Sequence, residues 1–178
     1  MAVRFSAGEV FEIAQQVERN GSRFYRRAAE SFQEGGETRG LLLNLAEMEE
    51  AHLRIFQNME EQLSDEERPE TFYDPYGETE QYLRALAGGQ VFDLRQDPTE
   101  WLGDSRSRAE ILAKAINVEK DSILFYLGMK DSVPEKLGRE EIDRIIQQEM
   151  NHVTLLTARL RYARKPAEGE AESGSRGD

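Results

Sequence analysis

The 178-residue chain contains no cysteine, and this absence excludes several classes of chemistry. A chain without thiols forms no disulfide, no thiolate zinc site and no iron–sulfur cluster, and it has no cysteine nucleophile. Positive charge is also scarce, with 23 Lys and Arg against 35 Asp and Glu and a formal net charge of −12. We therefore expect the chain to bind neither nucleic acid nor anionic membrane surfaces.

Long apolar segments are missing as well. No stretch of the sequence approaches the roughly 18 consecutive apolar residues that a membrane-spanning helix needs. Residues 1–5 are not followed by the apolar core of a signal peptide, so a cytoplasmic location is the expectation. The length corresponds to one domain that can bury a sizeable core.

Four stretches have the periodicity of amphipathic helices. Their apolar residues recur at alternating spacings of three and four, which is typical of helices that pack in a bundle. Capping-box patterns at Ser6 and Ser107 mark the starts of two of them. The predicted long helices cover residues 6–32, 37–63, 107–130 and 139–164, with a further short helix at 78–87.

The lengths of the connections predict how these helices are arranged. The links at 33–36 and 131–138 are short and favour antiparallel hairpins, whereas residues 64–104 are long enough to cross the whole bundle. The sequence therefore predicts an all-α fold, an antiparallel four-helix bundle of two helical hairpins joined by a long crossover, which is the ferritin-like topology. We expect this domain to span residues 1–164 and a disordered tail to follow at 165–178.

The two predicted hairpins carry the same polar residues at nearly the same spacing. Each has a Glu, a Tyr seven residues later, and then a Glu-x-x-His pair. These residues are Glu18, Tyr25, Glu49 and His52 in the first half and Glu119, Tyr126, Glu149 and His152 in the second. The match predicts that the hairpins are related by a pseudo-twofold axis along the bundle.

The four glutamates and two histidines occupy seam positions where a bundle helix would carry Leu or Ile. Burying an unpaired carboxylate costs several kcal/mol, and no Lys or Arg stands near them on the seams. Two divalent ions would neutralise four carboxylates, and oxygen and imidazole ligands suit Fe, Mn or Zn. A single Glu-x-x-His is common, and a purely structural polar network is the alternative. Because both histidines of the chain fall in this motif, the sequence favours a dinuclear metal site.

Three nearby residues have two interpretations each. Gly21, one turn after Glu18, either leaves room for a metal or an oxidant or permits a close helix contact. Tyr25 and Tyr126 either hydrogen-bond the ligand carboxylates or belong to an ordinary aromatic core. The sequence leaves these alternatives open.

The order of these motifs resembles the ferritin-like di-iron carboxylate superfamily, in particular its rubrerythrin-like branch, over about residues 6–163. The residues that carry the resemblance are Glu18, Glu49-x-x-His52, Glu119 and Glu149-x-x-His152. It implies that Glu49 and Glu149 bridge two iron ions, with the other two glutamates as terminal carboxylates and the histidines as terminal nitrogen ligands. It also implies catalysis at these four glutamates: reduction of hydrogen peroxide or dioxygen by Fe(II) in oxidative stress, or oxidation of Fe(II) for storage.

Three departures from the family pattern refine this expectation. Without cysteine there is no rubredoxin domain in this chain, so a separate electron-donor protein is expected. Classical rubrerythrins have an extra third-helix glutamate near the site that accompanies peroxidase activity. Here Ser122 stands three residues after Glu119 and no other seam glutamate is close, which argues against efficient peroxidase activity. Glu50 occupies the position of the haem-binding methionine of bacterioferritins, so haem is not expected. Iron binding or delivery without turnover is the alternative function, and a homodimer is the expected assembly.

Overall fold

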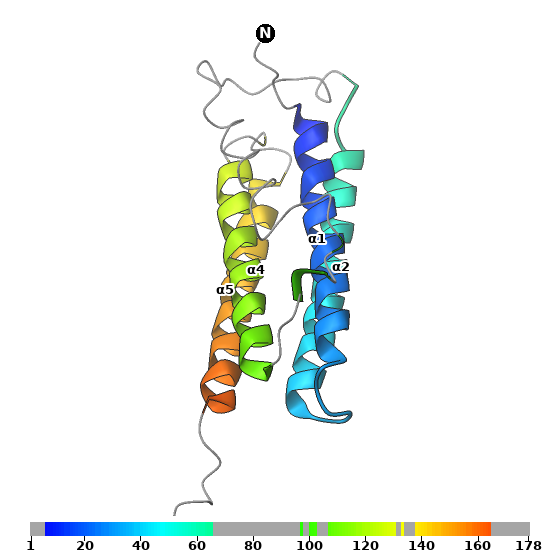
Figure 1. Cartoon of the computed structure of the whole chain (residues 1–178). Coiled ribbons are helices and arrows are strands. Elements are labelled where there is room, and N and C mark those ends of the chain that lie inside the picture. Colours follow the sequence, from blue (N-terminus) through cyan, green and yellow to red (C-terminus); the bar gives the residue numbers. More distant parts are fainter. Residues whose placement is uncertain are drawn as a thin grey trace, which may run out of the picture.

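The computed structural model describes residues 6–65, 97, 100–102, 107–130, 133 and 138–164. These residues form α-helices and one short 3-10 helix, and no strand occurs in this part of the chain (Figure 1). The elements are α1 (Ala7–Ala29), α2 (Glu37–Glu61), η1 (Glu100–Leu102), α4 (Arg108–Lys130) and α5 (Arg139–Ala163). The prediction of an all-α four-helix bundle is confirmed. The predicted helix at 78–87, most of the crossover and the tail at 165–178 lie outside the described residues.

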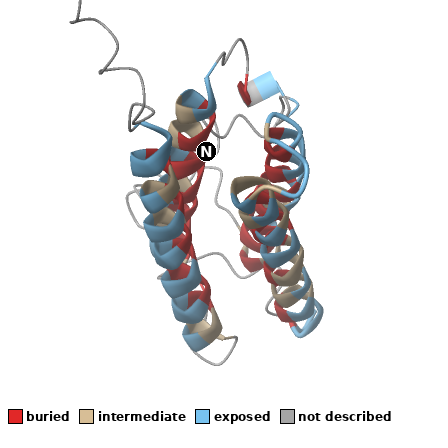
Figure 2. Ribbon diagram, turned by 90° about the horizontal axis from the view of Figure 1, so that it is seen from below, coloured by how far each residue is buried: buried red, intermediate tan, exposed pale blue. Residues whose placement is uncertain are grey.

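The four long helices are arranged as two hairpins. α1 packs along α2, and α4 packs along α5 (Figure 1). Between the hairpins, α1 contacts α4 and α2 contacts α5. The buried sides of the two hairpins face each other, and the exposed sides point outward (Figure 2). This arrangement makes the centre of the bundle the place where residues of all four helices meet.

The predicted capping boxes are present at both helix starts. The Ser6 hydroxyl accepts the backbone N–H of Glu9 at 3.2 Å, and the Glu9 carboxylate accepts the N–H of Ser6 at 2.7 Å. Ser107 and Glu110 make the same reciprocal pair, with both distances 3.1 Å. These bonds satisfy backbone donors that have no partner within the helix, which fixes where α1 and α4 begin.

The first helix ends three residues earlier than the apolar pattern predicts. After Ala29 the backbone N–H groups bond to carbonyls three residues back, as in the bond of 3.1 Å from Phe32 to Ala29. Such bonds tighten the last turn and end the α-helix. The chain then turns at Gly35, whose φ of +72° is a left-handed conformation that favours glycine. The other helix boundaries agree with the prediction to within two residues.

The predicted seams form the core. Their apolar side chains are buried, apart from Ile13 and Phe32, which are half-buried. The largest side chains buried completely are Tyr25, Tyr126, Phe11, Phe24, Phe56, Phe125, Leu42, Leu45, Leu112, Met129 and Ile142. Each Phe, Leu, Met and Ile side chain among them contributes about 1.5–3 kcal/mol of hydrophobic stabilisation to the packed hairpins.

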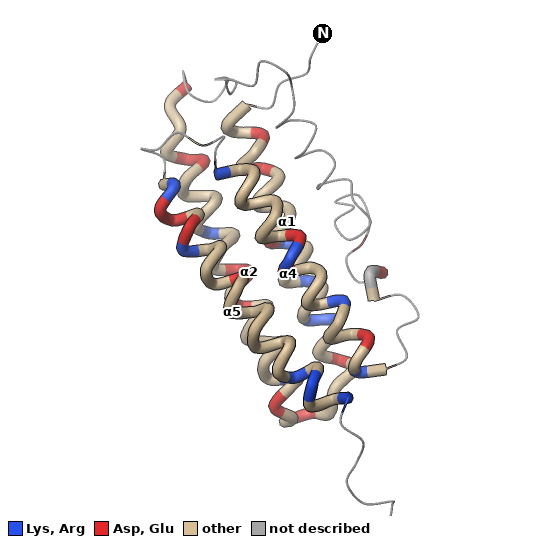
Figure 3. The backbone as a smooth tube through the Cα atoms, turned by 90° about the vertical axis from the view of Figure 1, so that its left-hand side faces the viewer, with Lys and Arg blue, Asp and Glu red and all other residues tan. Residues whose placement is uncertain are grey.

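Charged residues are distributed along the four helices and are not gathered at one end (Figure 3). Some of them join helices. Arg159 on α5 pairs with Glu37 on α2 at 2.6 Å, and Lys130 on α4 pairs with Asp143 on α5 at 2.6 Å. None of the described helices is long and apolar enough to cross a membrane.

Candidate metal centre

The structure brings all six predicted metal ligands together in the middle of the bundle. α1 and α4 supply one glutamate each, and α2 and α5 supply one Glu-x-x-His pair each. All six residues are buried and at most 5% exposed: Glu18, Glu49, His52, Glu119, Glu149 and His152. Four carboxylates and two imidazoles therefore share one buried space.

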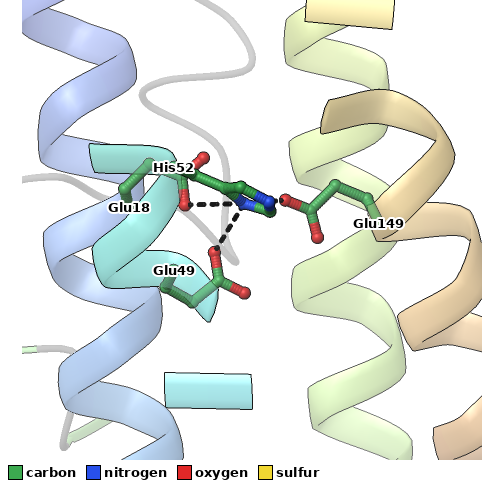
Figure 4. Close-up of side chains that lie close together, drawn as sticks. All are labelled: Glu18, Glu49, His52 and Glu149. Carbon is green, nitrogen blue, oxygen red and sulfur yellow. Dashed lines mark ion pairs between the residues drawn. The ribbon is translucent and has the colours of Figure 1, made fainter. Parts of the chain in front are cut away.

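The six residues form two overlapping groups. One consists of Glu18, Glu49, His52 and Glu149, and in it one ligand atom of each residue lies within 4.8 Å of the others (Figure 4). The second group consists of Glu49, Glu119, Glu149 and His152, and its ligand atoms also lie within 4.8 Å of one another. Each group draws residues from both hairpins, so neither group exists until the hairpins pack. Glu49 and Glu149 belong to both groups.

The first histidine faces three carboxylates. The Nδ1 atom of His52 lies 3.0 Å from Glu149 Oε1, 3.6 Å from Glu18 Oε2 and 3.8 Å from Glu49 Oε2 (Figure 4). These contacts come from three different helices. The imidazole therefore presents Nδ1 to the centre of the cluster.

The second histidine has the same geometry, but it faces the other oxygen of Glu49 and of Glu149. The Nδ1 atom of His152 lies 2.9 Å from Glu149 Oε2, 3.3 Å from Glu119 Oε1 and 3.9 Å from Glu49 Oε1. The two rings are stacked, with centroids 6.1 Å apart and planes inclined by 19°. Glu49 and Glu149 thus each turn one oxygen toward each histidine. This repetition agrees with the predicted pseudo-twofold relation of the hairpins.

The two tyrosines connect the hairpins by hydrogen bonds to two of the predicted ligands. The Tyr126 hydroxyl on α4 donates to Glu18 Oε1 on α1 at 2.5 Å, and the Tyr25 hydroxyl on α1 donates to Glu119 Oε1 on α4. Both rings are completely buried, so the two interpretations left open by the sequence hold together: the tyrosines are core residues that also bind the carboxylates. Burial and then the adjacent carboxylates raise the pKa of both phenols well above its usual value, so both remain hydrogen-bond donors.

Gly21 permits a close contact between α1 and α2. A Cβ atom at this position would lie 3.3 Å from both Cγ and Cδ of Glu49. That separation is tighter than ordinary van der Waals contact, so a side chain would push against the carboxylate. Of the two interpretations, the structure supports the close helix contact, and the contact is with a predicted metal ligand.

Burial and mutual repulsion shift the pKa values in the cluster. Burial, reinforced by the charge of Glu149, raises the pKa of both Glu49 and Glu119 well above the usual range. Burial alone would lower the pKa of His52, but the surrounding carboxylates outweigh it and raise the value. Burial also acts to raise the pKa of Glu149, and its interactions with Glu119 and the two histidines outweigh it and lower the value. Without a cation, the cluster must therefore retain protons to limit its negative charge.

The unpartnered atoms of the cluster fit a pair of metal ions. Although the Nδ1 atoms of the two histidines lie 3.0 and 2.9 Å from the Glu149 oxygens, these close pairs lack hydrogen-bond geometry. Among the described residues, Glu18 Oε2, both oxygens of Glu149 and both Nδ1 atoms are therefore buried without a hydrogen-bond partner. Buried polar atoms are nearly always satisfied, so a convergent set of this kind calls for a ligand. Within the described part of the chain, no ion pair joins these carboxylates to Lys or Arg. Oxygen and imidazole donors are the ligands that iron, manganese and zinc accept.

One polar contact to the cluster was not anticipated from the sequence. The Oε1 atom of Gln148 on α5 lies 2.6 Å from His52 Nε2 on α2. A carbonyl oxygen only accepts, so Nε2 carries the proton and Nδ1 faces the carboxylates. No sequence signal points to Gln148, because it is an exposed helical glutamine whose partner belongs to the other hairpin.

A solved structure supports this interpretation of the fold and the site. The chain is similar to a protein from Thermotoga maritima that is provisionally described as a ferritin-like diiron-carboxylate protein, with 28% sequence identity and a TM-score of 0.64. The alignment covers 89% of this chain and 96% of the other. No protein-family model and no curated protein matches the sequence. The chain therefore has the ferritin-like four-helix fold of this diiron-carboxylate protein, and its buried glutamate and histidine cluster fits a di-iron site.

Proposed function

We propose that the chain is a non-haem di-iron oxidoreductase that reduces hydrogen peroxide or dioxygen with Fe(II), as rubrerythrin-like peroxidases and ferroxidases do. The observation that carries the proposal is that Glu49 and Glu149 each direct one oxygen to each histidine. Carboxylates placed in this way would each offer one oxygen to each of two metal ions. One further glutamate and one histidine would complete the protein ligands of each ion. With this protein ligand set, the ions would be able to react with an oxidant.

Two ferrous ions held here would supply the two electrons that, with two protons, convert one hydrogen peroxide to two water molecules. The protein positions the ligands and excludes water from the site. Tyr25 and Tyr126 hold the two terminal carboxylates in place, and the surrounding apolar core excludes bulk water. Glu49 and Glu149 keep both of their oxygens directed into the cluster, so their charge faces both metal positions.

Iron is the metal we propose, because the donor set suits it and the similar structure is described as a diiron protein. Manganese and zinc accept the same ligands, so metal analysis of protein grown with all three metals tests the choice. The electrons for repeated turnover would come from a separate donor protein. We further propose a cytoplasmic homodimer, and sedimentation of the purified protein at monomer mass would contradict the dimer.

Two neighbouring glutamates on α2 provide a matched test. Glu49 lies in the cluster, whereas Glu50 pairs with Arg26 at 2.6 Å and its side chain is 42% exposed. Wild type and Glu50→Gln should each bind about two irons per chain, and their ferrous forms should gain a ferric absorption with peroxide or dioxygen. Glu49→Gln should lose the dinuclear site and this absorption. Wild-type iron stoichiometry in Glu49→Gln, or no reaction of ferrous wild type with either oxidant, would contradict the proposal.

The absence of cysteine favours one alternative, an iron-binding or iron-delivery protein without turnover, because the chain itself carries no thiolate redox centre. Steady-state consumption of peroxide separates the two functions. An oxidoreductase supplied with a reductant consumes many equivalents of peroxide per chain, and a delivery protein stops after its bound Fe(II) is oxidised. The faster of the peroxide and dioxygen reactions identifies the oxidant.

A further inference from the structure

The two histidines of the cluster differ on the side that faces away from it. His52 Nε2 is 2.6 Å from the side-chain carbonyl of Gln148. His152 Nε2 is buried and has no hydrogen-bond partner among the residues that the structure describes. The imidazoles are otherwise alike, because each presents Nδ1 to three carboxylates and each is 1% exposed.

The difference follows from one position in the repeat. Gln148 directly precedes Glu149 on α5, and Met48 directly precedes Glu49 on α2. The pseudo-twofold relation of the hairpins therefore places Met48 as the counterpart of Gln148. A glutamine carbonyl is a strong acceptor for an imidazole N–H, whereas a thioether is a weak one. At this position of the repeat, the sequence thus supplies an anchor for one imidazole and not for the other.

We infer that Gln148 is a positioning residue that makes the two metal positions unequal, so that the position built on His52 fills first and the position built on His152 binds more weakly. This inference rests on the proposed dinuclear site. A hydrogen bond to the remote nitrogen fixes the orientation and tautomer of a ligating imidazole and increases its basicity. Loss of such a partner typically lowers metal affinity about 10- to 100-fold. The unanchored His152 must be ordered when its ion binds.

The asymmetry gives the two positions different tasks. The ion on His52 would remain bound and hold the shared carboxylates of Glu49 and Glu149 in place. The ion on His152 would exchange more readily. An unequal pair of this kind suits a protein in which one iron position stays filled while the other gains and loses its ion.

Manganese(II) is a suitable probe, because it takes oxygen and imidazole ligands and is not oxidised during a titration in air. Calorimetry of the full-length metal-free protein gives the two binding steps, and electron paramagnetic resonance separates a single Mn²⁺ from an exchange-coupled pair. Wild type should bind the first ion about 10- to 100-fold more tightly than the second and show a mononuclear signal at one equivalent. Repulsion between the ions also separates the steps, so the variants decide the matter.

Three variants of exposed or half-exposed residues test the anchor. Gln148→Leu removes the acceptor and should weaken the first step about 10- to 100-fold while leaving the second nearly unchanged. Gln148→Glu keeps an acceptor for the same N–H and should restore the tight first step. Met48→Gln supplies an acceptor to the other imidazole and should strengthen the second step. Circular dichroism should show the same helix content in all three.

The result that would overturn the inference is a tight first step in Gln148→Leu, or an equal weakening of both steps. An unchanged second step in Met48→Gln would also contradict it. If wild type binds no Mn²⁺, Fe²⁺ or Zn²⁺, the dinuclear site itself is wrong. If it binds two ions and Gln148→Leu has no effect, the proposed function stands and only the asymmetry fails.

Discussion

Gly21→Ala should separate the stability of the helix from the affinity of the metal site. The glycine lies inside α1, where replacing glycine by alanine normally stabilises a helix by about 0.5–1 kcal/mol. The new methyl group would lie 3.3 Å from Cγ and Cδ of Glu49, so the carboxylate or the helix has to move by a few tenths of an ångström. The same substitution therefore favours the helix and disturbs a predicted bridging ligand.

The magnitude of the metal effect follows from the tolerance of coordination distances. Metal–ligand distances hold to within about 0.2 Å, so a displacement of a few tenths of an ångström at a ligand shared by both ions should weaken binding at least tenfold. A tenfold loss at saturating metal lowers the free energy of unfolding of the loaded protein by about 1.4 kcal/mol. For a chain of this length, that corresponds to a Tm roughly 3–6 °C lower. The metal-free variant should lose much less, because the gain in helix propensity opposes the contact.

Gly40→Ala is the matched control, because it lies in α2 and a Cβ atom there would have nothing within 4 Å. We expect Gly40→Ala to raise the Tm of metal-free and loaded protein by similar amounts and to leave metal affinity unchanged. Thermal unfolding with and without metal, together with a metal titration, measures both effects. The reasoning would be refuted if Gly21→Ala bound metal with wild-type affinity and its loaded form gained stability as Gly40→Ala does.

Three further predictions concern the cluster itself. The pKa values of Glu49, Glu119 and His52 are raised above their usual values in the folded metal-free protein. Near neutral pH the folded protein therefore binds more protons than the unfolded chain. Its free energy of unfolding should fall as pH rises, by at most about 1.4 kcal/mol per pH unit for each proton. Urea unfolding from pH 5 to 8 measures this dependence, and a free energy of unfolding that rises with pH would contradict the prediction. Removing metal with a chelator should lower the Tm, most at high pH, and an unchanged Tm would favour the purely structural bundle. Tyr25→Phe and Tyr126→Phe should each destabilise the metal-free protein by about 1–3 kcal/mol, because each leaves a buried carboxylate oxygen without its donor; wild-type stability in urea would refute this.

Features that depend on spacing along one helix could be predicted from the sequence. The 3.6-residue period places Glu49 and His52 on one face, and it places both on the same seam as Leu45 and Phe56. Capping boxes fixed two helix starts. The end of α1 was predicted three residues too late, because the apolar pattern continues to Phe32 while the backbone tightens after Ala29. Apolar periodicity reports burial and does not distinguish an α-helical last turn from a tighter one.

Contacts across helices could not be predicted in this way. The donation from each tyrosine to the glutamate of the opposite hairpin, the contact of Gly21 with Glu49 and the bond from Gln148 to His52 all depend on how far one helix is rotated and shifted against another. Rotation and shift come from the packing of side chains over the whole interface, and no local spacing encodes them.

The sequence by itself determined that the chain forms two similar hairpins with carboxylates and imidazoles on their inner faces, because helical periodicity and the cost of burying charge act within each segment. Only the tertiary structure decided that the groups from both hairpins converge on shared oxygens of Glu49 and Glu149. It also decided that, among the described residues, the imidazole of His52 has an anchoring partner and that of His152 has none. The physical reason is that hydrogen bonds and ligand sets are fixed by distances of a few ångströms between side chains about 30 to 100 residues apart, and those distances exist only after the hairpins have packed.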